Sequence, residues 1–217
     1  MTLDLFPDEP TTEPEAEQIA PGAVVLRRFA SERGPALLSA LEEVISQAPL
    51  RCMITPGGFR MSVAMTNCGA AGWITDRTGY RYGPLDPLTG RHWPAMPAAF
   101  TALASQAAAR AGFGTFLPDA CLINQYEPGS RLSLHQDRNE LDYGAPIVSV
   151  SLGLPAMFLF GGDLRSDKPQ RVALAHGDVV VWGGPARLRF HGVLPLKEGN
   201  HRLLGRRRIN LTLRKAL

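Results

Sequence analysis

Several common sequence features are missing from this chain, and each absence excludes a class of protein. No apolar run approaches the roughly 20 residues that span a membrane, so no membrane segment is predicted. Residues 1–18 contain six acidic residues and no Lys or Arg, so the basic start of a secretion signal is absent. Only three cysteines occur, without a C-x-x-C pair. That spacing argues against a disulfide framework or structural zinc site and fits the reducing cytoplasm.

The composition indicates one domain with a basic body. The chain has 217 residues, of which 45% are hydrophobic, enough for one substantial core. Residues 19–217 carry 23 basic and 14 acidic residues. Nucleic-acid-binding proteins show such an excess, because Lys and Arg neutralise phosphates, although many basic domains bind no nucleic acid.

Residues 1–20 are rich in Pro, Glu and Thr and contain few apolar residues. This composition predicts a flexible acidic tail that precedes a single domain over residues 21–217. The 22 glycines and 18 prolines favour turns and short strands over long helices.

Two helices and many short strands are expected along the chain. Apolar residues recur at a helical period in Pro35–Gln47, and an Ala-rich helix is predicted over Pro97–Gly112. A first strand is predicted over Ala23–Phe29. Further short strands are predicted at 121–126, 130–137, 147–152, 156–160, 171–174, 178–182, 189–193 and 207–213. The pattern predicts a mainly β (α+β) fold, a double-sheet jelly roll with outer supporting helices.

Residues 50–92 are less regular, with two short strand-like runs at 61–66 and 73–75 among glycines and aromatic residues. This stretch is long for a plain connector between elements. It therefore predicts a functional lid.

A candidate metal site lies in the run Ser133–Asp137. Side chains two residues apart leave the same face of a strand, so His135 and Asp137 can point at one spot. His191 is the obvious third ligand. Two histidines and one carboxylate with open positions are typical of non-haem Fe(II) oxygenases.

An H-x-D pattern alone is weak evidence, and the chain contains a second one at His176–Asp178. The Gly between those two residues and the apolar run that follows indicate a turn entering a strand. We therefore expect Asp178 to make turn hydrogen bonds and not to bind a metal.

The segment 208–214 alternates strictly between polar and apolar residues. Its polar face carries Arg208, Asn210, Thr212 and Arg214. Such a face can be solvated on a half-exposed strand, or it can point inward around an anionic ligand. Arginine binds carboxylates through a two-pronged, charge-assisted fork, so two arginines on one face suit a dicarboxylate.

Taken together, these motifs resemble the AlkB family of Fe(II)/2-oxoglutarate-dependent dioxygenases. The resemblance covers residues 21–214 and keeps the family's motif order. Further matching stretches are Pro56–Gly58, Met61–Asn67, Asn124-x-Tyr126, Pro146–Leu154 and Gly177–Gly184. The fold implied is a double-stranded β-helix, or jelly roll.

The resemblance implies three cofactors: Fe(II), 2-oxoglutarate as co-substrate, and O₂. The iron would be held by His135, Asp137 and His191. The implied 2-oxoglutarate contacts are Asn124, Tyr126, Arg208, Asn210, Thr212 and Arg214. Arg208 is the better candidate for the far carboxylate and Arg214 for the end near iron, but the sequence does not settle that order.

The resemblance also makes residues 50–92 a nucleotide-recognition lid. Trp73 would stack on the target base opposite His135, Tyr80 and Tyr82 would contact the substrate strand, and Arg165 would add a basic contact. Core packing is the alternative for the aromatic residues. Asn139 departs from the family, which commonly has an acid there. An amide favours cationic bases less, so we expect weaker discrimination for cationic over neutral lesions.

The implied reaction is oxidative dealkylation of bases such as N1-methyladenine and N3-methylcytosine in single-stranded DNA. It releases succinate, CO₂ and formaldehyde. The alternatives are the same chemistry on RNA (tRNA), a protein side chain or a metabolite, and a non-enzymatic binding module with a vestigial metal site. The expected protein is a cytoplasmic monomer without a membrane partner.

Overall fold

The computed structural model describes residues 16–217, which form fourteen strands, two α-helices and one 3₁₀ helix. The helices are α1 (Gly34–Gln47), α2 (Ala98–Arg110) and the 3₁₀ helix Gly184–Ala186. The strands of the N-terminal half are β1 (Ala16–Ala20), β2 (Ala23–Leu26), β3 (Arg51–Ile54), β4 (Arg60–Gly69), β5 (Gly72–Asp76) and β6 (Gly79–Gly83). The later strands are β7 (Ala120–Tyr126), β8 (Leu132–His135), β9 (Ile147–Gly153), β10 (Ala156–Phe160), β11 (Gln170–Leu174), β12 (Val179–Trp182), β13 (His191–Val193) and β14 (Arg208–Arg214).

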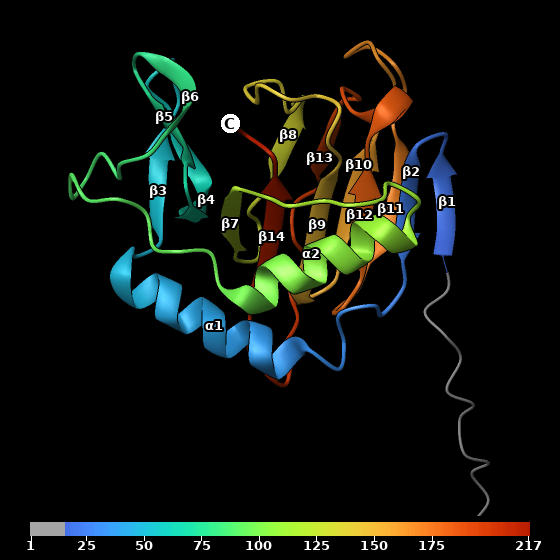
Figure 1. Ribbon diagram of the computed structural model, residues 1–217, viewed down its shortest axis with the longest axis horizontal. Coiled ribbons are helices and arrows are strands. Elements are labelled where there is room, and N and C mark those ends of the chain that lie inside the picture. The colour runs from blue at the N-terminus through green and yellow to red at the C-terminus, as the bar shows by residue number, and fades with distance from the viewer. Residues whose placement is uncertain (1–15) are drawn as a thin grey trace, which may run out of the picture.

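The strands form two main sheets and a separate hairpin. The large sheet has eight strands in the order β1-β2-β12-β9-β14-β7-β4-β3, and the small sheet has four in the order β11-β10-β13-β8. All the paired strands described are antiparallel. Strands β5 and β6 form a two-stranded hairpin that stands beyond the end of the large sheet (Figure 1).

The large sheet has two buried faces with different neighbours. Its outer face packs against α1 and α2, which run across the sheet in Figure 1. Ile209, Leu211 and Leu213 of β14 belong to this outer core. The inner face packs against Phe158 and Phe160 of the small sheet, in a second core.

This arrangement decides between the two readings of the alternating segment 208–214. Because the apolar residues of β14 face the helices, its polar residues face the inside, between the sheets. Arg208 is 1% exposed and Arg214 is 4% exposed. A solvated polar face is therefore excluded, and the strand places two cations in the interior.

Most of the predicted elements are confirmed. Helices α1 and α2 lie where the helical patterns place them, and each of the eight strands predicted after residue 120 has a counterpart. The strand predicted over Ala23–Phe29 ends at Leu26 because the chain turns at Arg28, which has a φ of 56°. Strands β3 and β6 were not expected.

The predicted tail over residues 1–20 is wrong for its last five residues. Residues 1–15 lie outside the described part of the chain. Ala16–Ala20 form β1, which pairs with β2, and its end is buried at Ile19 and Ala20. The ladder of backbone hydrogen bonds, which composition does not reveal, orders this segment.

The cysteines are closer in space than in sequence. Cys68 of β4 and Cys121 of β7 are cross-strand partners, and both are buried. All three cysteines are free thiols in the structure. Within residues 16–217, neither helix is long and apolar enough to cross a membrane.

Candidate active site

Strand pairing brings the three predicted metal ligands together. His135 ends β8, Asp137 follows two residues later, and His191 begins β13. Because β8 and β13 are adjacent and antiparallel, His135 and His191 are direct cross-strand partners although 56 positions separate them in the sequence numbering. The small sheet thereby joins two remote segments at one spot.

The geometry of this triad fits a small metal ion. The Nε2 atom of His135 lies 3.8 Å from Asp137 Oδ1, and Nε2 of His191 lies 3.5 Å from Asp137 Oδ2. One ligand atom from each residue lies within 4.8 Å of the other two. Within the described residues, these three side chains form the one group of His, Cys, Asp or Glu residues that could hold a metal ion. Two histidines and one carboxylate are the ligand set of non-haem Fe(II) sites.

Both imidazole rings are oriented by backbone carbonyls. Nδ1 of His135 lies 2.9 Å from the Ser133 carbonyl oxygen, and Nδ1 of His191 lies 3.0 Å from that of Arg189. When Nδ1 donates its proton there, the Nε2 lone pair is free for a metal. Burial, then repulsion from His191, lowers the pKa of His135 to about 4, so its ring is neutral at neutral pH. The side chain is still 34% exposed, which leaves part of the ring open to a ligand.

Arg214 lies directly beside the metal-site carboxylate. Its Nη2 and Nε atoms donate to Asp137 Oδ2 at 2.7 and 3.1 Å. Burial alone would raise the pKa of Asp137, but Arg214 and then His191 hold it well below its usual range. The carboxylate is therefore ionised, and a guanidinium stands at the end of β14 that is next to the candidate metal site.

Arg208 stands at the other end of β14 and leaves most of its N–H groups without a hydrogen bond. It donates one bond, from Nη2 to Ser151 Oγ at 3.0 Å, and lies over the Tyr126 ring at 5.0 Å. Its Nε and Nη1 atoms are buried without a hydrogen bond among the described residues, as is Oδ1 of Asn124. Burial lowers the pKa of this guanidinium, and Tyr126 offsets the effect only in part. A buried fork with free N–H groups suits a carboxylate, so the interior fits the far end of 2-oxoglutarate.

Asn210 and Thr212 are buried on the same face but are already bonded. Asn210 Nδ2 donates to Ser149 Oγ at 2.8 Å and to the Val150 carbonyl at 2.9 Å. Thr212 Oγ1 donates to Asn210 Oδ1 at 2.9 Å. Sequence reasoning missed Ser149 and Ser151, although their alternation within an apolar strand was a visible signal.

The predicted lid residues gather around Asn139. Trp73 and Tyr80, on the paired strands β5 and β6, stack with ring centroids 5.5 Å apart and planes at 18°. The Trp73 indole N–H donates to Asn139 Oδ1 at 3.4 Å, and Asn139 Nδ2 donates to the Tyr80 carbonyl at 3.5 Å. Asn139 therefore connects the hairpin to the loop that follows Asp137.

Tyr82 is tied to a buried ionic network that the sequence did not reveal. Its hydroxyl donates to Glu140 Oε1 at 2.7 Å and accepts from Arg214 Nη1 at 3.3 Å. Glu140 also pairs with Arg187 at 3.2 Å, and Arg187 donates to the Asp137 carbonyl at 2.8 Å. Among the described residues, the Tyr82 hydroxyl therefore anchors the hairpin to the body, and its predicted contact with a substrate strand stays a prediction.

The two remaining predictions concern Arg165 and the second H-x-D pattern. Arg165 is exposed, with its guanidinium 6.0 Å from the centre of the Phe190 ring, next to His191. Asp178 accepts from the backbone N–H groups of Ala175 and Arg28, both at 2.9 Å. The turn role predicted for Asp178 is confirmed.

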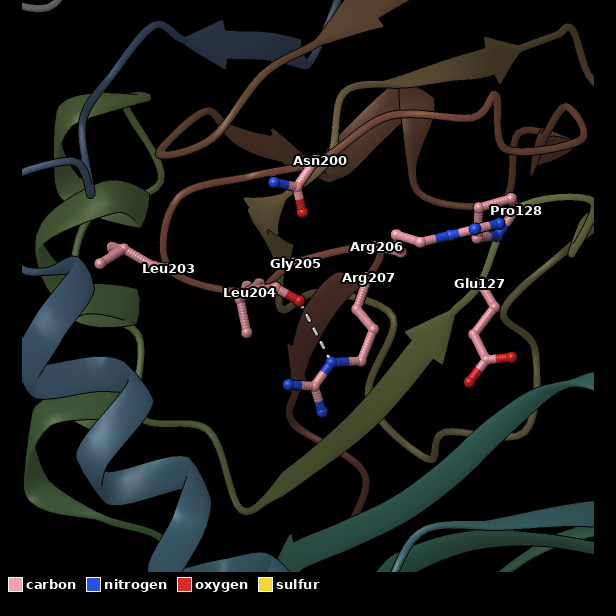
Figure 2. A pocket seen from close by; sticks show the side chains of 8 residues that line it. All are labelled: Glu127, Pro128, Asn200, Leu203, Leu204, Gly205, Arg206 and Arg207. Carbon is pink, nitrogen blue, oxygen red and sulfur yellow. Dashed lines mark hydrogen bonds between the residues drawn. The ribbon is translucent and has the colours of Figure 1, made fainter.

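The surface also has a pocket of about 650 Å³, whose lining side chains are drawn in Figure 2. It is bounded by the turn after β7 and the loop before β14, at the end of β14 opposite to Arg214. Its lining residues are Glu127, Pro128, Asn200, Leu203, Leu204, Gly205, Arg206 and Arg207. None of the predicted site residues lines this pocket.

Comparisons with known proteins agree with this geometry. The family model of the 2OG-Fe(II) oxygenase superfamily matches residues 22–214. "Alpha-ketoglutarate-dependent dioxygenase AlkB" of Salmonella typhimurium is 59% identical over 214 residues, 99% of this chain and 98% of that protein. The Escherichia coli protein of the same name is 58% identical with the same coverage.

The fold comparison leads to the same family. A solved structure described as "The structure of OsALKBH1" superposes with a TM-score of 0.82 at 28% identity, covering 93% of this chain and all of that one. Fe(II), 2-oxoglutarate and O₂ are the cofactors of the family, and the triad and the unpaired guanidinium suit them. The chain belongs to the 2OG-Fe(II) oxygenase superfamily and, within it, to the AlkB group of dioxygenases.

Proposed function

We propose that this protein oxidatively dealkylates N-alkylated bases, such as N1-methyladenine and N3-methylcytosine, in single-stranded DNA. The observation that carries the proposal is the convergence of His135, Asp137 and His191 beside two buried arginines on one strand. The bound Fe(II) and 2-oxoglutarate would supply, with O₂, the oxidising power that hydroxylates the alkyl carbon. Succinate, CO₂ and formaldehyde would be released.

The two arginines are proposed to hold opposite ends of 2-oxoglutarate. Arg214 is bonded to Asp137, so it would meet the end that reaches the iron. Arg208 has the free N–H groups that would bind the far carboxylate. Asn124 and Tyr126 lie opposite Asn210 and Arg208 across the ladder between β7 and β14 and would line the same channel with Thr212. The two sheets around it are proposed to form a double-stranded β-helix.

The hairpin β5–β6 and its flanks, within residues 50–92, are proposed to form a lid that recognises the nucleotide. The target atom lies on the pairing edge of a base, so the base must be unpaired or flipped. Trp73 is proposed to stack on that base from one side while His135 meets the other. Stacking on an aromatic ring contributes about 1–3 kcal/mol per base, which suits single strands. Tyr80, Tyr82 and Arg165 are proposed to contact the strand.

Asn139 is proposed to set lesion preference. Its amide contacts the indole N–H of Trp73, so it lies next to the proposed stacking platform. An amide offers dipoles but no negative charge, and therefore favours a cationic methylated base less than a carboxylate would. Neutral adducts such as etheno bases should be comparatively good substrates.

RNA is the second candidate substrate. Stacking and phosphate contacts recognise single strands of either kind, and the excess of basic residues over 19–217 serves both. All the residues named here come from one chain, so a monomer suffices for the reaction.

Product analysis on a methylated oligonucleotide tests the proposal. The protein is incubated with Fe(II), 2-oxoglutarate and an oligonucleotide with one N1-methyladenine, in air and without O₂. We expect formaldehyde and the repaired base in equal amounts, in air alone. An unmethylated strand and the His135→Ala variant are the controls. Release from the unmethylated strand, or none from the methylated strand, would refute the proposal, and a matched RNA strand separates the two substrates.

A further inference from the structure

We propose that Arg189 binds a backbone phosphate of the substrate strand, next to the nucleotide whose base is flipped. The inference rests on the proposed function and adds a contact that no motif in the sequence indicated. It follows from the position of this side chain, its missing partners and the charge around it.

Arg189 lies at the edge of the metal site. It precedes His191 by two residues, and its carbonyl oxygen lies 3.0 Å from His191 Nδ1. Its guanidinium lies 6.0 Å from the centre of the Phe160 ring. Phe160 is the cross-strand partner of His191 and faces the inner core with it. The Arg189 side chain is therefore on the face that carries the iron ligand, and it is only half-buried.

Arg189 lacks the anion that its neighbours have. Its Nε atom is buried without a hydrogen bond, and within residues 16–217 its guanidinium has no ion pair among those the structure shows. Nearby, Arg187 pairs with Glu140 and Arg214 with Asp137. Among the residues that the structure describes, the other arginine with buried, unbonded N–H groups is Arg208, the proposed 2-oxoglutarate contact. A half-buried guanidinium with an unbonded N–H group and no ion pair can bind an anionic group of a ligand.

A phosphate is the anion that a nucleic-acid strand brings to this edge. Arg165 lies over the ring of Phe190, the residue next to Arg189 in sequence, so a second cation lies close to this segment of the chain. In Figure 1, β13 and the hairpin β5–β6 lie on opposite sides of β8, which carries His135. A strand whose base enters between Trp73 and His135 would therefore pass its backbone over this basic edge.

The test measures how salt weakens binding. Fe(II)-loaded protein with 2-oxoglutarate, kept without O₂ to prevent turnover, is titrated against a fluorescent single strand with one N1-methyladenine. Fluorescence anisotropy gives the binding constant between 50 and 200 mM NaCl. Each phosphate neutralised on a single strand contributes about 0.7 to the slope of log K against log salt. We expect Arg189→Gln to lower the slope by about that amount and Arg189→Lys to keep it.

Arg206→Gln is the matched control, because Arg206 is exposed, pairs with Glu198 and borders the surface pocket. It should keep the wild-type slope. A second experiment replaces one phosphate flanking the lesion with a neutral methylphosphonate. That change should weaken binding by wild-type protein and by Arg206→Gln, but not by Arg189→Gln.

The outcomes are separable. An unchanged slope in Arg189→Gln, an equal loss in Arg206→Gln, or equal sensitivity of all proteins to the methylphosphonate overturns the phosphate contact. Failure of the wild-type protein to bind or dealkylate the strand overturns the proposed function itself. A thermal melt of each variant shows whether it is folded, and Arg189→Met, which also removes the charge and should lower the slope equally, tests the slope if the Gln variant is not.

Discussion

At the residue scale, the interior of this protein contains a buried guanidinium, that of Arg208, to which the described residues supply no carboxylate. Arg208 is 1% exposed, and two of its three guanidinium nitrogens have no hydrogen bond among the described residues. Unbonded buried donors destabilise a protein by about 1–3 kcal/mol each. A ligand that bonds these N–H groups with a carboxylate would remove this destabilisation. This is the role proposed above for 2-oxoglutarate.

Replacing Arg208 with Met tests that connection. A charge-assisted hydrogen bond contributes about 1.5–3 kcal/mol, so the Kd for 2-oxoglutarate should rise about 10- to 100-fold. Without 2-oxoglutarate the variant should melt at the same temperature or higher, because an unpaired buried charge is gone. Calorimetry and thermal melting measure the two effects. Unchanged 2-oxoglutarate binding would show that Arg208 is not its contact, and Arg206→Met controls for loss of charge.

The neutral state of His135 makes a prediction about pH. Its pKa is lowered to about 4 in the folded protein, below the ordinary value of 6.5. The neutral ring therefore stabilises the metal-free fold fully above pH 6.5, and this contribution is lost as pH falls from 6.5 to 4. An NMR titration of the metal-free protein should give a midpoint near 4 for this ring. A midpoint near 6.5 would contradict the desolvated environment described here.

Asn139→Asp tests the origin of lesion preference. A new carboxylate beside the base would attract a cationic methylated base, so kcat/KM for N1-methyladenine relative to a neutral etheno adduct should rise about 5- to 30-fold. One to two kcal/mol is the expected scale for a charge pair near a protein surface. Asn139→Gln, which keeps the amide, should leave the ratio near its wild-type value. An unchanged kcat/KM ratio in the Asp variant would show that the charge at position 139 does not set lesion preference.

At the scale of elements, the hairpin β5–β6 is fastened to the body from several segments, and these bonds include Asn67 to the Trp73 backbone and Trp93 to the Gly83 carbonyl. Tyr82 reaches Glu140, and Trp73 reaches Asn139. Asn139 and Glu140 are also close to Asp137 in sequence. Through these two residues the hairpin is linked to the loop that contains Asp137.

Tyr82→Phe should loosen this hairpin. The lost hydroxyl donates to a buried carboxylate, a bond of about 1.5–3 kcal/mol, so amide exchange in β5 and β6 should become at least about tenfold faster. Exchange in β14 should not change. Tyr80→Phe is the control, since the described residues show no bond to its hydroxyl. Equal exchange in Tyr82→Phe and wild type would mean that other contacts hold the hairpin.

The strands also show which parts of the structure could be predicted from the sequence. The alternation of β14 predicted both its strand and its two faces, and the H-x-D spacing with His191 predicted the triad that β8 and β13 bring together. Strand β1 was not predicted, because its state depends on pairing with β2. The pair of Glu140 and Arg187 was also missed, since 47 positions separate these residues and no local pattern connects them. Contacts fixed only by tertiary packing leave no periodic signal.

At the scale of the whole molecule, the helices, the large sheet and the small sheet form three layers with different roles. The helices cover the outer face of the large sheet and give β14 an apolar support. The small sheet supplies the triad, and the space between the sheets holds the polar face of β14. The excess of basic residues over 19–217 is on the body that carries this site.

The most direct test of the central claim is calorimetric titration of 2-oxoglutarate into the protein under anaerobic conditions, with and without Fe(II). If His135, Asp137 and His191 hold iron beside Arg208 and Arg214, one molecule should bind per chain, and binding should weaken sharply without the metal or in Asp137→Ala. Equal binding with and without Fe(II), or wild-type binding by Asp137→Ala, would contradict the account.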